Sequence, residues 1–187
     1  MRIISFSDQF GLTLAVKSGS KTMTRRKTKY EIGQELGVSE RYQDIYERIE
    51  DEEGIAAAID FAQRVLIAHG KDPHDARAAA RLAGWRNKMY VKADLMPTHI
   101  VITDRREEPL QCISDEDCLK EGIYERKDVI APGMERVVCY AFDGTPHVFR
   151  FPREAFAALI NKISGKGTWE RNESQYAYTF KLTGDEG

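Results

Sequence analysis

The sequence predicts an α+β fold, and three observations support this prediction. Runs of alternating or β-branched residues, which are typical of strands, occur near both ends of the chain and in its middle. Segments with helical periodicity lie between them, without the regular strand and helix alternation of a doubly wound sheet. The chain has 187 residues, of which 42% are hydrophobic and 31% charged, as expected for one globular domain over 1–187. We favour a small barrel with helices on its openings.

The first elements follow from local patterns. Residues 2–6 predict an opening strand, and Ser7 or Asp8 is the expected cap of a short helix. That helix is expected to end at Gly19, since glycine suits a left-handed C-terminal cap. Residues 35–39 predict a second strand.

A helical insertion is expected over residues 42–84. Residues 42–60 carry seven acidic residues and one basic residue, and we expect a solvated loop around Asp51. Apolar residues at helical spacing predict a helix over 55–70, and a cap followed by proline predicts a second helix over 72–84.

The rest of the chain returns to a pattern rich in strands. The Ser114-x-x-Asp117 sequence matches a capping box, and Asp143-Gly144 is a typical hairpin turn. The expected elements are a strand from residue 98, a helix over 114–122, a hairpin of 136–142 with 146–151, a helix over 152–165 and a strand over 176–182.

The charges are unevenly distributed along the chain. The net charge of −2 and the pI near 6.1 argue against a protein that coats nucleic acid through uniform positive charge. Residues 17–29, however, contain six basic residues and no acidic one. A focused basic site is therefore compatible with the composition.

Cysteine and histidine patterns indicate neither disulfides nor a metal site. The three cysteines form no Cys-x-x-Cys pair, and the four histidines have no metal-ligand spacing. No signal peptide or membrane span is predicted. We therefore expect a soluble cytoplasmic protein with reduced thiols, without metal or cofactor.

The turn around Gly19 is the strongest local motif. It differs from a phosphate-binding P-loop because Ser20 separates Gly19 from Lys21 and a helix, not a strand, precedes it. Nucleoside triphosphate hydrolysis is therefore not expected.

The turn instead resembles the signature of the ASCH family, a branch of the PUA-like fold. Gly19, Lys21, Thr24 and Arg26 fill the pattern Gly-x-Lys-x-x-Thr-x-Arg. Further segments are similar to larger phage-associated ASCH proteins, so that the resemblance covers most of the chain outside the insertion: 32–38, 84–90, 95–97, 110–123 and 156–172.

This resemblance implies a PUA-like barrel whose cleft faces RNA or a modified nucleoside. Some small ASCH proteins hydrolyse the amide of acetylated cytidine, and others have been linked to ribonuclease activity. For a hydrolase, the resemblance implies a catalytic set of Lys21, Thr24 and Glu121, with Glu121 placed only by its distance into the helix after Ser114.

The chemistry of this set is physically coherent. A threonine hydroxyl becomes nucleophilic when a base takes its proton, and a lysine desolvated beside Arg25 and Arg26 can have a lowered pKa. A carboxylate can then protonate the leaving amine. The simpler alternative is that Thr24 is a strand residue, Lys21 contacts phosphate, and Glu121 ends a helix or pairs with Arg26.

Other residues are candidates for ligand contacts. Gly19, Arg25 and Arg26 belong to the proposed binding turn, and we expect both arginines to be partly exposed, with one paired to a carboxylate of 115–121. The aromatic rings that could stack on unpaired bases are Trp85, Tyr90 and Trp169. Ordinary packing is the alternative for each ring.

Three functions remain open at this point. The first is binding of RNA or a modified nucleoside, and the second is hydrolysis of an amide or phosphodiester in the same cleft. The third is a protein-interaction module of a mobile element that uses residues 42–84 as its partner surface. The sequence does not indicate the oligomeric state.

Overall fold

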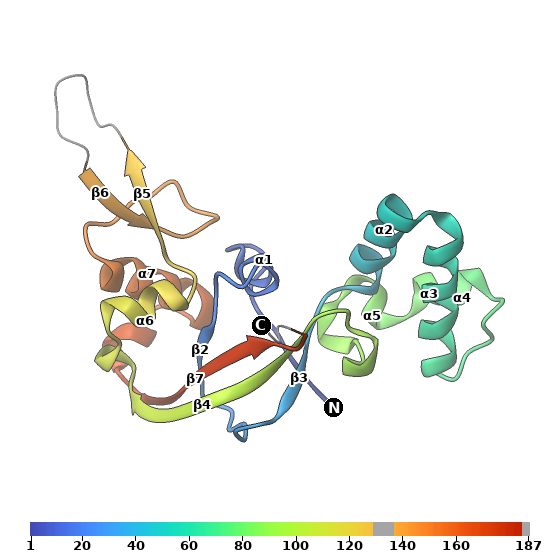
Figure 1. The fold of residues 1–187 in the computed structure, drawn as a ribbon, viewed down its shortest axis with the longest axis horizontal. Coiled ribbons are helices and arrows are strands. Elements are labelled where there is room, and N and C mark those ends of the chain that lie inside the picture. The colour runs from blue at the N-terminus through green and yellow to red at the C-terminus, as the bar shows by residue number, and fades with distance from the viewer. Residues whose placement is uncertain (129–136, 185–187) are drawn as a thin grey trace. The chain divides into compact units, whose positions relative to one another are not determined.

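The fold is α+β in a computed structural model that describes residues 1–128 and 137–184 (Figure 1). The chain divides into two compact units. The first consists of Met1–Phe6 and Glu35–Ile100, and the second of Ser7–Gln34 with Val101–Gly187.

Five strands form a mixed sheet in the order β1-β3-β4-β7-β2. Their bounds are β1 Arg2–Ile4, β2 Met23–Arg26, β3 Glu35–Val38, β4 His99–Pro109 and β7 Ser174–Leu182. β1 runs parallel to β3 with Ile3 opposite Gly37, and β2 runs antiparallel to β7 with Thr24 opposite Tyr178. Among the strands of the described residues, β1 and β2 remain edges and no closed barrel is found, so the expected PUA-like barrel is not confirmed.

A separate two-stranded sheet joins β5 (Tyr124–Asp128) to β6 (Val137–Ala141). The predicted hairpin of 136–142 with 146–151 is confirmed only in part, since β6 pairs mainly with β5, and residue 136 lies outside the described residues. Only one bridge, between Tyr140 and Phe149, joins β6 to that segment.

The other regular elements of the described residues are helices. They are α1 Leu12–Lys17, α2 Tyr42–Glu53, α3 Ile55–Ala68, α4 Ala76–Arg81, α5 Ala83–Arg86, α6 Asp115–Lys120, α7 Pro152–Ser164 and α8 Thr168–Arg171. Three short 3₁₀ helices cover η1 Lys88–Tyr90, η2 Ala93–Leu95 and η3 Leu110–Cys112. None of the helices in these described ranges is both long and apolar enough to cross a membrane.

The first unit contains the predicted helical insertion, with two corrections. Asp51 lies on α2 and not in a loop, because the apolar stripe of α2 packs onto the core through Tyr42 and Ile45. The second predicted helix begins four residues later, where the Asp75 side chain accepts hydrogen bonds from two backbone N–H groups, and it breaks at Leu82, whose backbone is extended.

The core of the first unit is centred on Tyr42. This side chain is fully buried against Phe61 and Val65 of α3. Its hydroxyl accepts a hydrogen bond of 2.8 Å from the Lys92 N–H and lies 3.1 Å from Nε2 of His69. The polar end of the tyrosine is thereby satisfied inside an apolar cluster.

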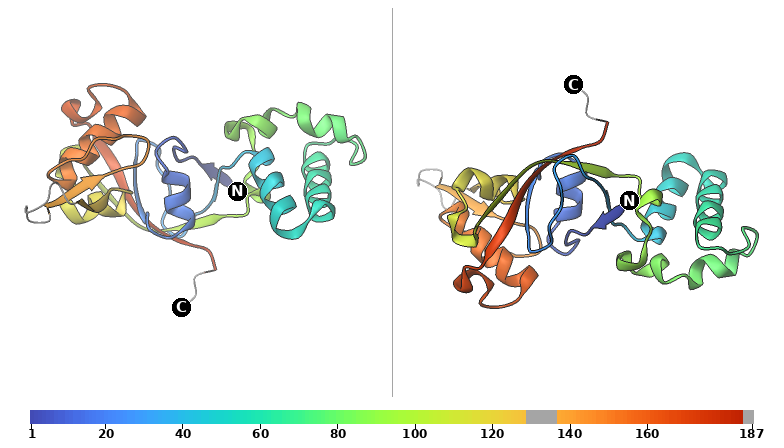
Figure 2. Two further views of the ribbon diagram at one scale, coloured as in Figure 1. Left: turned by 90° about the horizontal axis from the view of Figure 1, so that it is seen from above. Right: turned by 90° about the horizontal axis from the view of Figure 1, so that it is seen from below.

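In the second unit, α6 contacts both β2 and α7. β4 and β7 run side by side, as both views of Figure 2 show. The expected start of α6 is confirmed, since the Ser114 hydroxyl accepts a hydrogen bond of 3.1 Å from the Asp117 N–H. The start of α7 at Pro152 is also confirmed. Glu121, at the C-terminal end of α6, is thereby placed beside β2.

The start of α1 differs from the prediction. The helix begins at Leu12, after Gly11 with φ of +64°, and neither Ser7 nor Asp8 caps it. The Asp8 carboxylate instead accepts a hydrogen bond of 2.6 Å from the Thr13 hydroxyl. Residues 8–11 form turns, which shorten the helix by one turn relative to the expectation.

Candidate functional site

The turn between α1 and β2 positions Lys21. Gly19 has a φ of +74°, a left-handed conformation that favours glycine. The Ser18 and Ser20 hydroxyls each donate to the Ala15 carbonyl at 3.1 Å, and the Lys21 N–H reaches the same oxygen at 2.9 Å. These hydrogen bonds end α1 and direct the chain into β2.

The Lys21 ammonium is buried against Glu121. Only 2% of the Lys21 side chain and 6% of the Glu121 side chain are exposed. Nζ donates to the Glu121 backbone carbonyl at 2.6 Å and to its Oε2 at 2.8 Å. The structure therefore brings together two of the three residues expected for catalysis, although they are separated by 100 positions in the sequence.

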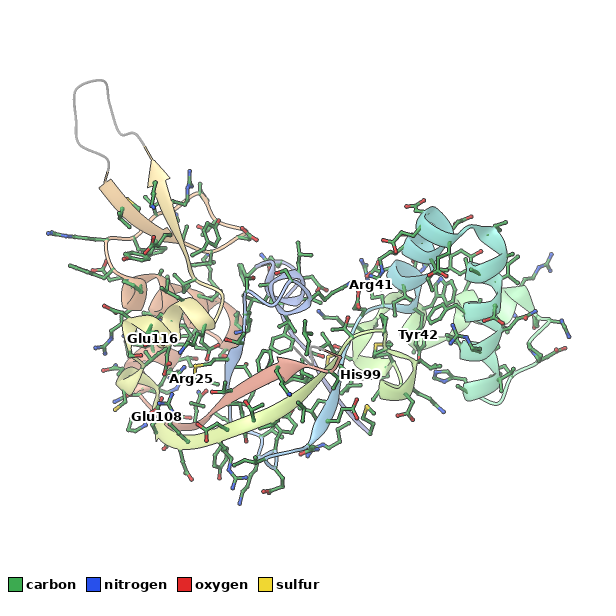
Figure 3. The ribbon with its side chains drawn as sticks, viewed as in Figure 1. Arg25, Arg41, Tyr42, His99, Glu108 and Glu116 are labelled. Carbon is green, nitrogen blue, oxygen red and sulfur yellow. The ribbon has the colours of Figure 1, made fainter. Side chains whose placement is uncertain are left out.

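Arg25 extends this pair into a buried ionic cluster (Figure 3). Its guanidinium donates to Oε1 of Glu121 at 3.0 Å and to Oε1 of Glu108 at 2.6 Å. A weaker contact of 3.4 Å reaches Oδ2 of Asp117, which also accepts from Arg106 at 2.6 Å. Three cations and three carboxylates thus face one another, and Arg106, with 48% of its side chain exposed, is the member at the solvent edge of the cluster.

The prediction that Arg25 is partly exposed is wrong, since 1% of its side chain is accessible. Burial of a guanidinium is tolerated here because carboxylates from β4 and α6 surround it. The expectation that one arginine pairs with a carboxylate of 115–121 is confirmed by Arg25 with Asp117 and Glu121. Arg26 is half-buried.

Thr24 is paired with Arg26. The Arg26 Nε donates to Thr24 Oγ1 at 3.2 Å, and Thr24 itself is buried. Side chains alternate along a strand, so these two residues share one face of β2 while Arg25 is on the other. The Thr24 hydroxyl therefore accepts a hydrogen bond from the Arg26 guanidinium and can still donate its own proton.

Charge and burial set the pKa values of the central pair. Burial lowers the pKa of the Lys21 ammonium below its ordinary value, and contact with Glu121 opposes only part of this effect. Burial acts to raise the pKa of Glu121, but the nearby charges of Lys21 and Arg25 lower it overall. Burial also lowers the pKa of Arg26. Glu121 is therefore a carboxylate, and Lys21 is a more ready proton donor than a lysine in water.

A small pocket of about 100 Å³ adjoins Lys21. It is lined by Gly19, Thr22 and Phe180, among others. A second pocket of about 190 Å³ is lined by residues of α1, by Ser18 and Ser20 of the turn after it, and by residues of the segment after α6. The signature turn therefore has open space next to it in the same unit.

Two of the three aromatic candidates, Trp85 and Tyr90, belong to the other compact unit. Trp85 packs on the helical cluster of that unit, with its ring centre 5.7 Å from that of Tyr46. Tyr90 is 61% exposed. Trp169 lies in the same unit as Lys21 and packs edge-on against Phe156. Packing accounts for both tryptophans.

Sequence reasoning missed two members of the ionic cluster, Arg106 and Glu108. Asp117 was expected only as one of the carboxylates of 115–121 that could pair with an arginine, and its carboxylate accepts from two arginines. The alternation of charges on β4 was the available signal for Arg106 and Glu108, since residues two apart lie on one face of a strand.

Metal and thiol chemistry have no support in the part of the chain that the structure describes. No group of three or more His, Cys, Asp or Glu residues there is placed to hold a metal ion. Cys112 is exposed, while Cys118 and Cys139 are buried, and none forms a disulfide. Burial raises the pKa of Cys118 to about 12, so its thiol is not nucleophilic near neutral pH.

Comparison with known proteins gives no relative. No family model, no curated protein and no solved structure matches the chain. The similarity to the ASCH family therefore stays a prediction from the sequence.

Proposed function

We propose that the turn at Gly19 and the start of β2 bind RNA or a modified nucleoside. The observation that carries this proposal is the buried contact of 2.8 Å between Lys21 and Glu121 at the ASCH-like signature, beside an open pocket. RNA or a modified nucleoside is also the class of ligand that the resemblance to the ASCH family implies. The relation to PUA-like barrels is part of the same proposal.

The charge distribution favours recognition of one nucleotide over tracking along a strand. Carboxylates already neutralise Lys21 and Arg25, so these two cations are not available to phosphates. Lys27 and Lys29 are exposed, but Lys27 pairs with Glu173. Few exposed cations remain for the phosphate backbone, whereas buried polar groups can select a base or a ribose.

Binding tests this proposal with a matched pair of variants. We would titrate the full chain with single-stranded RNA, cytidine and acetylated cytidine, using Arg26→Gln and Lys29→Gln. Arg26→Gln should weaken binding by about tenfold or more because it removes the cation beside Thr24. Lys29→Gln should have little effect on the free nucleosides. Equal binding by wild type and Arg26→Gln would show that the turn at Gly19 and the start of β2 are not the binding site.

We propose amide hydrolysis as the second candidate function, since two observations favour it. Burial lowers the pKa of Lys21, and Arg26 Nε places positive charge 3.2 Å from Thr24 Oγ1. That charge favours loss of the hydroxyl proton as the threonine oxygen attacks an acyl carbon, and the negative charge passes to the carbonyl oxygen. The proton lost by Thr24 is carried by water to the amine nitrogen as the carbon–nitrogen bond breaks, and a second water then releases acetate and restores the Thr24 hydroxyl.

Product analysis separates this second function from binding. Wild type should release cytidine and acetate from acetylated cytidine, Thr24→Ala should not, and Thr28→Ala should act like wild type because its side chain is exposed. If wild type turned over the substrate no faster than Thr24→Ala, hydrolysis at Thr24 would be excluded. The binding proposal would be unaffected, because Arg26→Gln tests it separately. The same assay with single-stranded RNA tests ribonuclease activity.

A further inference from the structure

The first unit contains an apolar pocket of about 310 Å³ that the proposed nucleoside site does not use. Its lining includes side chains of four helices: Tyr46 of α2, Ile59 and Leu66 of α3, Ala80 of α4 and Trp85 of α5. The two aromatic rings form one wall, with their centres 5.7 Å apart. A pocket of this size and composition accommodates one large apolar side chain.

An apolar stripe of α3 continues beyond the pocket. Ile55 and Ile59 are one helical turn apart, and they are 51% and 47% exposed. Leu66, on the same helix, lies buried in the pocket lining. A partner that also has helical periodicity can cover such a stripe, with anchors at intervals of three or four residues.

The α2 edge of the pocket is strongly acidic. Glu50 and Glu53 follow Tyr46 by four and seven residues, so they lie on the same side of α2. The last turn of this helix has four consecutive acidic residues over 50–53 and no basic one. The negative end of the helix dipole adds to their field, which costs helix stability unless a cation approaches. On α4, Arg77 and Arg81 are exposed.

We infer that this pocket binds a helical segment of a protein partner that has an apolar anchor and a basic side. The anchor enters the pocket and packs against the wall formed by Tyr46 and Trp85, and lysines or arginines of the segment face Glu50 and Glu53. RNA is not favoured here, because the α2 edge repels phosphates. The inference is independent of the function proposed for Lys21.

A selection experiment with the full chain identifies the ligand class directly. A displayed library of random 16-residue peptides with helical propensity is selected on wild type and counter-selected on Ile59→Lys. We expect enriched peptides with large apolar residues at intervals of three or four and with excess Lys and Arg. No enrichment over Ile59→Lys, or enrichment of acidic peptides, would overturn the inference. So would RNA binding that Glu50→Lys strengthens while no peptide binds.

Binding of a selected peptide by fluorescence anisotropy provides the matched controls. Ile59→Lys should weaken it by about tenfold or more, whereas Ile67→Lys, which is exposed on α3 but does not line the pocket, should not. Glu50→Lys should weaken it by about threefold to tenfold, and Glu52→Lys by less. If Ile59→Lys and Ile67→Lys weakened peptide binding equally, the pocket would not be the binding surface. If Glu50→Lys and Glu52→Lys weakened it equally, the acidic edge would not contact the peptide.

Discussion

Replacing Glu121 by Gln tests whether the buried ionic cluster supports the fold of its unit. The substitution keeps the size of the side chain but removes the charge that Lys21 and Arg25 share at 2.8 and 3.0 Å. Removing one partner of a buried pair costs roughly 3–5 kcal/mol, because the other charge stays desolvated. Arg25 keeps Glu108 and Asp117, and Lys21 can lose its proton, so we expect the lower end, about 3 kcal/mol.

Urea denaturation measures this effect. In a Trp85→Phe background the remaining Trp169 reports on the unit that contains Glu121. With a slope of about 2 kcal/mol per molar urea, the midpoint should fall by roughly 1.5 M. Glu116→Gln is the control, since it removes a carboxylate from the same helix that is 77% exposed. A midpoint shift for Glu121→Gln no larger than that of Glu116→Gln would refute the reasoning.

Three further predictions use pH, salt and thiol reagents. The lowered pKa of Glu121 stabilises the folded state above the ordinary value of 4.5, and this contribution is lost as the pH falls through the lower, folded-state pKa. The stability difference between wild type and Glu121→Gln should therefore narrow in acid denaturation series, and a constant difference would contradict it. If single-stranded RNA binds through residues 17–29, the few exposed cations there predict a slope of log K against log salt no steeper than about −2, and a titration with a steeper slope would indicate phosphate contacts elsewhere. A thiol reagent should modify Cys112 rapidly in the native protein and reach Cys118 and Cys139 only on unfolding; rapid modification of all three would show that the burial is wrong.

Local patterns were sufficient to predict most helices and strands of the fold. Periodicity and caps located α3, α6 and α7, because those signals depend on neighbouring residues. They gave the segment after Gly144 as a partner of β6, which one bridge confirms, but not the more extensive pairing with β5. They also placed Asp51 in a loop, because seven acidic residues over 42–60 masked the weaker apolar stripe of α2.

The candidate site was only partly predictable, because its residues come from distant parts of the chain. The family-like signature pointed to Lys21, and the resemblance placed Glu121 only by its distance into the helix after Ser114; the structure brings the two into contact. Burial of Arg25 was not predictable, because an arginine in sequence is normally read as exposed and its carboxylates come from β4 and α6. Only the folded chain shows which charged side chains are buried next to one another.

The carboxylates around Arg25 also have a consequence for folding kinetics. They come from positions 83 to 96 residues away, and the whole segment Glu35–Ile100 lies between β2 and those carboxylates in the sequence. Contacts across such long loops form only after the loop-closure entropy has been overcome. The cluster is therefore expected to assemble after the folding transition state, so that it slows the unfolding rate far more than it accelerates folding.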